Sequence, residues 1–312
     1  MRSSDSYLAV IGWVFPTTVI IIITEMTETD KHLFSVQLRK ATKNIHDVSD
    51  ALVNAKLGAT INDDSVWAEG LLVFYEVFKV RPRQEEMLKG FFLIFFFKFL
   101  EDALKSHSDS LIGDLLIEHM ERTEAFQADL AFFYGGNWTE NYSVRPEVQN
   151  YLDHLREIEQ ENPYLLIPYI YHLYMGLFSG GQILQAKRRY LSLTTNSEQP
   201  RPGEAVTTYS QETIASLKKK LRQAVNDLAD NLDEETKEAI LTESVKVFEL
   251  NNTVIKSVKG INQVLLRRLF KFFIAAMLLL LFFFAYFFKT ASELEVDGDL
   301  YGDSMKINNE EL

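Results

Sequence analysis

The stretch YIYHLYMGLFSGGQILQ, residues 169–185, is the part of this chain that decides how the rest is interpreted. Its apolar and aromatic residues recur at helical spacing, yet it contains Gly176, Gly180 and Gly181. A glycine inside a helix costs roughly 1 kcal/mol relative to alanine, so three of them need a reason. Gly176 and Gly180 are four residues apart and therefore share one helix face, which carries no side chain at either position. Gly180 and Gly181 together also allow a kink.

Two interpretations explain this glycine face. The simpler one is close packing of the helix backbone against a second helix. The other is that something flat and large, such as haem, lies directly against the backbone. The glycines alone do not separate the two, because an isolated short motif also arises by chance.

The composition limits the fold and the function. The chain has 312 residues, 47% of them hydrophobic, which is enough for one large domain with appendages. Only 7 prolines and 14 glycines, together with long patterns of period 3.6, predict an all-α fold. A net charge of -12 argues against general nucleic-acid binding. The absence of cysteine excludes disulfides, cysteine-ligated metals and thiol nucleophiles.

A long apolar run lies near the C-terminus. The residues FFIAAMLLLLFFFAYFF, 272–288, cover most of a hydrocarbon core of roughly 30 Å at about 1.5 Å per residue. We therefore expect a membrane anchor at residues 270–289, because a soluble helix of this length needs a polar face. An acidic and disordered tail is expected at residues 290–312.

The N-terminal side contains a second apolar run, from Tyr7 to Ile23, within an appendage of residues 1–30. This run has the length of a signal-like or short membrane segment, although Pro16 weakens it. Residues 31–260 are expected to form one helical domain. The phenylalanine-rich residues 91–99 are too short to span a bilayer, so we expect them to pack in the core.

Among six histidines, His46 stands out. It lies beside an apolar stripe in LRKATKNIHDVSD, residues 38–50, with basic neighbours. A histidine in such a position is more often a boundary residue with one hydrogen bond than a ligand. No HExxH, P-loop or GxGxxG motif is present, so no other chemistry competes with it.

Several segments together resemble one family. LRKATKNIH, residues 38–46, resembles the proximal helix of haem oxygenases, and DLAFFYGGNW, residues 129–138, resembles their DLAFxYG stretch. SGGQ, residues 179–182, resembles the end of their distal helix. KKKLRQAVNDL, residues 218–228, and FELN, residues 248–251, resemble later family segments in the same order. The chain therefore resembles a membrane-anchored haem oxygenase of the eukaryotic type.

The resemblance implies an all-α domain that holds haem between a proximal helix and a kinked distal helix. It places His46 at the axial iron ligand, and Asp50, four residues later, could be a hydrogen-bonding partner of that imidazole. Gly176 and Gly180 fall on the distal glycines that let the backbone approach haem and leave room for O2.

The resemblance also implies a set of groups that bind the two haem propionates. Two carboxylates at the mouth of a pocket require arginine, lysine or hydroxyl donors. The positions that match are Arg39, Tyr171, Lys218 and Arg222.

Two departures from the family pattern stand out. The family has an aspartate directly after the first distal glycine, where it organises the water network that supplies protons. This chain has Leu177 there, and leucine neither donates nor accepts a hydrogen bond. His172 and Tyr174, about one turn away, are candidate substitutes. The other departure is the segment from Val80 to Lys98, which interrupts a family helix as an extra piece.

The function implied is O2-dependent opening of haem to biliverdin, Fe²⁺ and CO, with electrons from NADPH through a flavoprotein reductase. The alternative is a haem-binding sensor or sequestering protein with weak oxygenase activity, because of Leu177. A structural, membrane-anchored helical bundle is a third interpretation. The positive residues before the C-terminal run place the domain in the cytosol at the endoplasmic reticulum membrane, with membrane lipid as a further partner.

Overall fold

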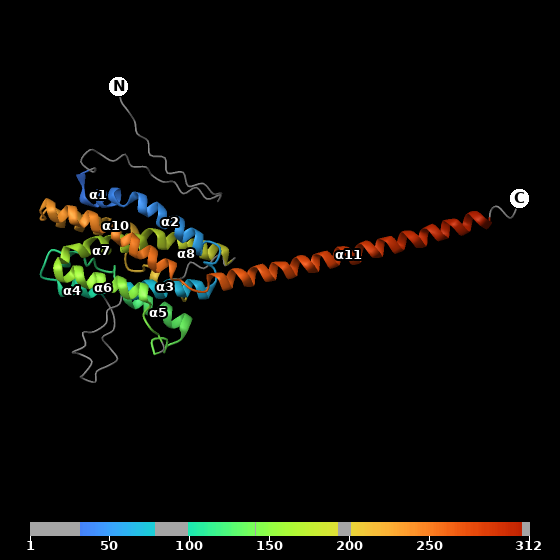
Figure 1. Ribbon diagram of the computed structural model, residues 1–312, viewed down its shortest axis with the longest axis horizontal. Helices are drawn as coiled ribbons and strands as arrows, with labels where there is room; N and C mark the ends of the chain where they lie inside the picture. Colours follow the sequence, from blue (N-terminus) through green and yellow to red (C-terminus); the bar gives the residue numbers. More distant parts are fainter. Residues whose placement is uncertain (1–31, 79–98, 141, 193–200, 308–312) are drawn as a thin grey trace, which may run out of the picture.

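The computed structural model describes residues 32–78, 99–140, 142–192 and 201–307. These ranges form helices and no strand, which confirms the all-α prediction. Figure 1 shows a body of helices with α11 projecting from one end. The α-helices are α1 (Phe34–Ala41), α2 (Lys43–Leu57), α3 (Asp64–Phe78), α4 (Phe99–Ser106), α5 (Thr123–Tyr134), α6 (Pro146–Glu161), α7 (Ile167–Gly176), α8 (Gln182–Leu191), α9 (Ile214–Ala229), α10 (Glu234–Lys256) and α11 (Ile261–Ile307).

Two sequence predictions lie outside the described residues. The apolar run from Tyr7 to Ile23 is one of them, and the extra segment from Val80 to Lys98 is the other. The phenylalanine-rich run at 91–99 falls outside with that segment, apart from Phe99 at the start of α4.

The helix α7 lies in the centre of the body. It is apolar on nearly every side, so burial of Tyr169, Ile170 and Tyr174 leaves no polar face to solvent. The long helix α10 packs against α7 and also against α1, α2 and α6. This packing holds the segment with the glycines in a fixed place relative to α1 and α2.

The predicted kink is present as a π-helical turn. The turn η5 (Leu177–Gly181) joins α7 to α8 and contains both Gly180 and Gly181. A π-helical turn inserts an extra residue into the helical repeat, and such turns are a known cause of helix kinks. The expected distal helix is therefore α7, η5 and α8 in succession.

The expected proximal helix is interrupted. The resemblance predicts one continuous proximal helix from about Arg39 to Asp50, but α1 ends at Ala41 and α2 begins at Lys43. Between them, the Thr42 hydroxyl donates a hydrogen bond to the Leu38 carbonyl at 2.9 Å. Hydroxyls bonded back to the preceding turn bend helices, which accounts for the break.

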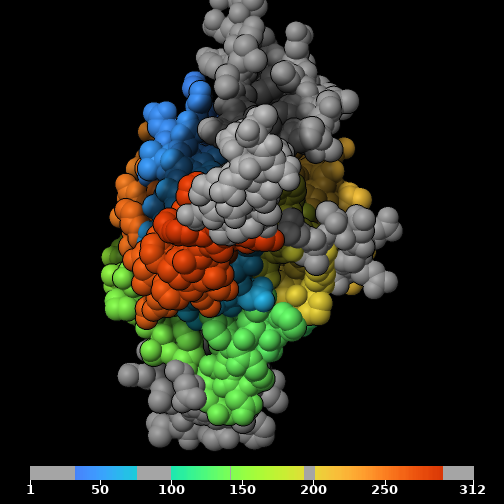
Figure 2. Space-filling view, turned by 90° about the vertical axis from the view of Figure 1, so that its right-hand side faces the viewer, coloured from blue at the N-terminus to red at the C-terminus, as the bar shows by residue number. Residues whose placement is uncertain are grey.

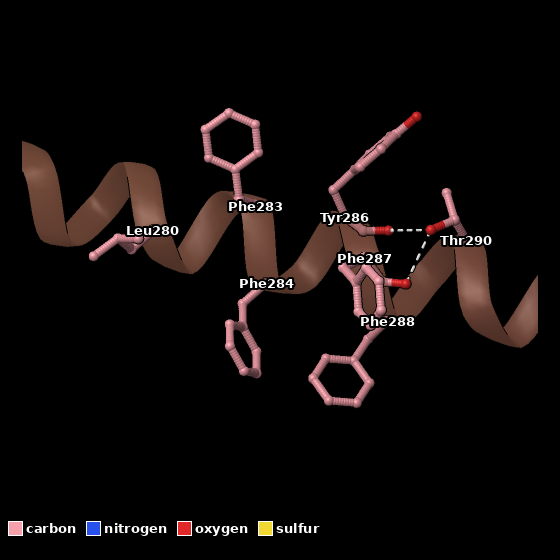
Figure 3. A pocket seen from close by; sticks show the side chains of 7 residues that line it. All are labelled: Leu280, Phe283, Phe284, Tyr286, Phe287, Phe288 and Thr290. Atoms are coloured by element: carbon pink, nitrogen blue, oxygen red, sulfur yellow. Dashed lines mark hydrogen bonds between the residues drawn. The ribbon is translucent and has the colours of Figure 1, made fainter.

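The helix α11 is 47 residues long and corrects the prediction of a disordered tail. It continues beyond Thr290 to Ile307, because adding a residue to an existing helix avoids the cost of nucleation. Its segment Ile261–Thr290 is long and apolar enough to cross a membrane, and none of that segment's most apolar window is buried. Figure 3 shows Phe283, Phe284 and Phe288 extending outwards from this helix.

Candidate functional site

His46 lies in the first turn of α2, on an accessible surface. Its side chain is 55% exposed, and its Nδ1 lies 3.3 Å from a carboxylate oxygen of Asp50. The expected contact between these two residues is therefore present. A carboxylate at Nδ1 favours the tautomer in which Nε2 is free to bind a metal. The His46 ring also lies 5.5 Å from the ring of Phe248 on α10, which limits its movement.

The glycine face of the distal helix is open. A Cβ atom placed on Gly176 or Gly180 would meet no described atom within 4 Å. Gly181 differs, because a Cβ there would touch the Thr207 methyl at 3.4 Å. Close packing of another described helix against Gly176 and Gly180 is therefore the wrong explanation. The space beside these two glycines is open, so a flat ligand could lie directly against the backbone there.

The four residues assigned to the propionates come together from three helices. The Tyr171 hydroxyl on α7 donates to the Ser35 carbonyl at 3.3 Å, and the guanidinium of Arg222 on α9 lies near that hydroxyl. Burial raises the pKa of Tyr171, while the charges of Arg222 and of Arg39 on α1 act against that rise. The pKa of Lys218 is lowered by partial burial and by the nearby Arg222 charge.

This convergence matters because like charges repel. Among the described residues, no carboxylate forms a salt bridge with Arg39, Lys218 or Arg222. In a chain of net charge -12, Arg39 and Arg222 thus lie near Tyr171, and Lys218 lies near Arg222, without a salt bridge to any described carboxylate. Such a cluster suits a ligand that carries carboxylates.

Leu177 is three residues before Gly180, on the same side of the distal helix. It is half-buried and packs against the main hydrophobic cluster. Its side chain contributes no polar group near the glycines, as the sequence predicts.

Tyr174 and His172, the candidate substitutes for the missing aspartate, have different surroundings. Tyr174 is fully buried, and its hydroxyl donates to Glu101 at 2.9 Å, so it is engaged on the core side. Sequence reasoning missed Glu101, which also accepts a hydrogen bond from the Arg122 backbone at 2.7 Å. The local sequence does not mark Glu101 as buried, because it is followed by Asp102, which is exposed.

His172 lies four residues before Gly176 and therefore on the same side of the distal helix. Its ring lies 5.0 Å from that of Phe248, which also contacts His46. The Nε2 atom of His172 is buried and has no hydrogen-bond partner among the described residues. Burial, with a smaller contribution from His46, lowers the pKa of His172 to about 3, so its imidazole is neutral.

A second missed feature fixes the loop before α9. Asp129, in the DLAF segment, is buried and accepts hydrogen bonds from the Ala205 and Val206 backbone, both at 2.9 Å. Burial raises the pKa of Asp129, although these two bonds act against that rise. This contact holds Thr207 beside Gly181.

The chain is similar to several known proteins. The family model described as "Heme oxygenase" matches residues 85–257, which include the distal glycines, Lys218 and Arg222 but not His46. The heme oxygenase of Rhodella violacea is 25% identical over 232 residues, which cover 72% of this chain and 87% of that protein. Heme oxygenase 2 of Macaca fascicularis is 31% identical, with 56% of this chain and 55% of that protein covered. Heme oxygenase 1 of Nostoc is 28% identical, over 66% of its length.

Solved structures show the same fold. Heme oxygenase-1 from Synechocystis, in complex with heme, superimposes with a TM-score of 0.62 at 22% identity, covering 76% of this chain and 98% of that one. Heme oxygenase 2 from Chlamydomonas reinhardtii, without heme, gives a TM-score of 0.58 at 24% identity. With more than half of its length matched by the family model, the chain belongs to the haem oxygenase family.

Proposed function

We propose that this protein is a haem oxygenase, which opens haem to biliverdin, Fe²⁺ and CO using O2 and electrons from an NADPH-dependent flavoprotein reductase. The observation that carries the proposal is the open glycine face of Gly176 and Gly180. Bound haem would supply the iron that activates O2 and would itself be the molecule degraded. The protein's part is to bind and orient that substrate and to supply protons.

Binding and orientation follow from the residues already described. His46 would hold the iron through Nε2, with Asp50 fixing the ring. Arg39, Tyr171, Lys218 and Arg222 would hold the propionates, and so set the rotation of the ring in its plane. Gly176 and Gly180 would leave space for a small second ligand on the distal side.

A haem sensor or sequestering protein is the second candidate, and Leu177 is the observation that favours it. The position that supplies a carboxylate in the family pattern carries an apolar side chain packed on the core. Haem binding would then persist while turnover is poor, since proton supply and ligation are separate tasks.

One experiment separates these functions. The full-length protein in detergent is mixed with haem, its absorption spectrum is recorded, and a flavoprotein reductase with NADPH is added. An oxygenase gives an imidazole-type haem spectrum that decays with release of biliverdin and CO. A sensor gives the same initial spectrum without release of either product, and a purely structural protein gives no haem spectrum.

We further propose that α11 anchors the protein in the endoplasmic reticulum membrane with the folded domain in the cytosol. The support is the length and exposure of Ile261–Thr290 and the cations Arg267, Arg268 and Lys271 on the side of the domain. A cytosolic domain would face the same compartment as an electron donor that uses NADPH.

A further inference from the structure

The connection between the folded domain and α11 is short and fixed. Helix α10 ends at Lys256 and α11 begins at Ile261. In the first turns of α11, Val264 is buried against the domain. Arg267 forms an ion pair with Asp63 at 2.9 Å. These contacts hold the start of α11 against the segment between α2 and α3.

Arg268 completes this attachment. It donates one hydrogen bond to the Ala59 carbonyl and another to the Asn62 side chain at 2.8 Å. Burial acts to raise the pKa of Asp63, but hydrogen bonds from Ser65 and, after them, the charges of Arg267 and Arg268 lower it below its usual value. The direction of α11 relative to the domain is therefore set by side-chain contacts.

The apolar run begins immediately beyond this attachment. From Arg268 to Phe272 is four residues, or about 6 Å along a helix. The headgroup layer on each side of a hydrocarbon core is also roughly 5–8 Å thick. A bilayer that begins its hydrocarbon core at Phe272 therefore brings its headgroups against the domain surface around Ala59–Asp63.

The surface around that point carries side chains suited to a membrane interface. The carbonyl of Leu191 accepts a hydrogen bond from Asn62, so the end of α8 lies next to Arg268. There Tyr190 is 59% exposed and Leu191 38% exposed. On the other side, the hydroxyl of the exposed Tyr134 donates to Glu69, which also accepts from the Lys259 backbone. Tyrosine is enriched at membrane–water interfaces.

Ion pairs neutralise several carboxylates at this end, which lowers the repulsion from an anionic lipid surface. Four carboxylates near the base of α11 each pair with an arginine, in spite of the net charge of -12. The pairs are Asp63–Arg267, Asp64–Arg188, Glu69–Arg145 and Glu204–Arg189. Lys259 and Lys271 are exposed beside them. Figure 2 looks at this end, with α11 towards the viewer and the green surface of residues near 130–145 directly below it.

We propose that this end of the folded domain, marked by Tyr134, Tyr190 and Leu191 around the base of α11, rests on the lipid surface of the membrane that α11 enters. The contact is peripheral and adds to the anchor. The inference rests on the proposed anchoring by α11 and is independent of the haem chemistry. The rim residue Arg39 lies on α1, beyond the far end of α2, so this contact leaves the proposed haem mouth exposed to water.

The absence of cysteine allows a direct test, because every introduced cysteine is unique. Full-length Tyr134→Cys and Tyr190→Cys are labelled with a fluorophore and reconstituted in phosphatidylcholine vesicles with a minor fraction of phosphatidylserine. Some lipids carry a quencher at the headgroup. Leu279→Cys, within α11, with a chain-attached quencher, reports whether the anchor is inserted. Glu235→Cys is the matched control, since it is exposed at the opposite end of α10.

We expect loss of fluorescence at positions 134, 190 and 279 and none at 235. A flexible Gly-Ser insertion between Gly260 and Ile261 should restore fluorescence at 134 and 190 while 279 stays quenched. Quenching at 279 without quenching at 134 and 190 would overturn the docking but leave the anchor intact. No quenching at 279 would refute the anchoring itself. Shielding of 134 and 190 by a second copy, seen as self-quenching without dependence on quencher lipid, would also overturn the proposal.

Discussion

The Nδ1 atom of His46 lies 3.3 Å from a carboxylate oxygen of Asp50, one helical turn further along α2. Asp50 therefore orients the imidazole ring that is proposed to bind haem iron through its other nitrogen. If His46 binds haem iron, His46→Ala should lose the imidazole-ligated absorption spectrum in both ferric and ferrous states. Asp50→Ala should keep that spectrum but weaken haem binding by about tenfold or more, as loss of such partners does. His32→Ala, an exposed histidine before α1, is the control and should behave as wild type. An unchanged spectrum in His46→Ala would rule out the ligand assignment.

The second prediction concerns Leu177. If the missing carboxylate limits proton supply, Leu177→Asp should raise the yield of biliverdin per haem consumed, measured by absorbance after reductase-driven turnover. The wild type should lose more turnover to uncoupled products. Ile183→Asp is the matched control, because it adds a carboxylate at an exposed position of α8. Equal yields in wild type and Leu177→Asp would mean that another group already supplies the protons.

The third prediction concerns the rim. Arg222→Glu should weaken haem binding by roughly tenfold or more, because a hydrogen bond to a charged group contributes about 1.5–3 kcal/mol. It should also change the ratio of biliverdin isomers, since the propionates set the rotation of the ring. Lys219→Glu makes the same charge change on an exposed neighbouring position of α9 and should alter neither. Affinity and isomer ratio that stay constant in Arg222→Glu would exclude a rim role.

The fourth prediction is a pH dependence from His172, whose pKa is lowered to about 3 by burial and, less, by His46. In the unfolded chain the imidazole of His172 has a pKa near 6.5. Below that pH the unfolded state therefore binds more protons than the folded state. The stability of the ligand-free protein should therefore fall as the pH falls from about 6.5 towards 3. At pH 5 the loss from this group is about 2 kcal/mol. Urea unfolding at pH 7 and pH 5 measures it, and His172→Leu should remove this part of the difference. The same difference in His172→Leu and wild type would assign the effect to other groups.

The fifth prediction is topology. The sequence contains two glycosylation acceptors, at Asn137 and Asn141, and Asn137 lies exposed in the loop after α5. A cytosolic domain should carry no glycan at either position after expression in a eukaryotic cell. An endoglycosidase-sensitive mass shift that disappears in Asn137→Gln with Asn141→Gln would place the domain in the lumen, and would make a cytosolic reductase an untenable partner.

Local residue spacing predicts some features of this structure. The spacing of Gly176, Gly180 and Gly181 is enough to predict a kinked helix with one bare face, because glycine acts through its own missing side chain. The spacing of His46 and Asp50 likewise places both on one helix face. The break at Thr42 was not predicted, because a threonine that bends a helix in one context is tolerated in another.

The long-range contacts were beyond what the sequence alone determines. Glu101 and Tyr174 are 73 positions apart, and Asp129 binds a backbone 76 positions later. Nothing in the local pattern marks either carboxylate as buried. Arg39, Tyr171, Lys218 and Arg222 were grouped through family resemblance, and their meeting from three helices follows only once α9 packs on α1 and α7.

The fixed attachment of α11 has a consequence for encounters with an electron donor. From Ala59, where Arg268 is bound, back to His46 is 13 residues, or about 20 Å along a helix. Only four residues, 257–260, connect α10 to α11, so there is no long flexible linker that would let the domain move relative to the anchor. The iron position proposed at His46 would then keep a constant height above the bilayer. A donor anchored in the same membrane would have to match that height and would search only in two dimensions, by lateral diffusion and by rotation about the membrane normal.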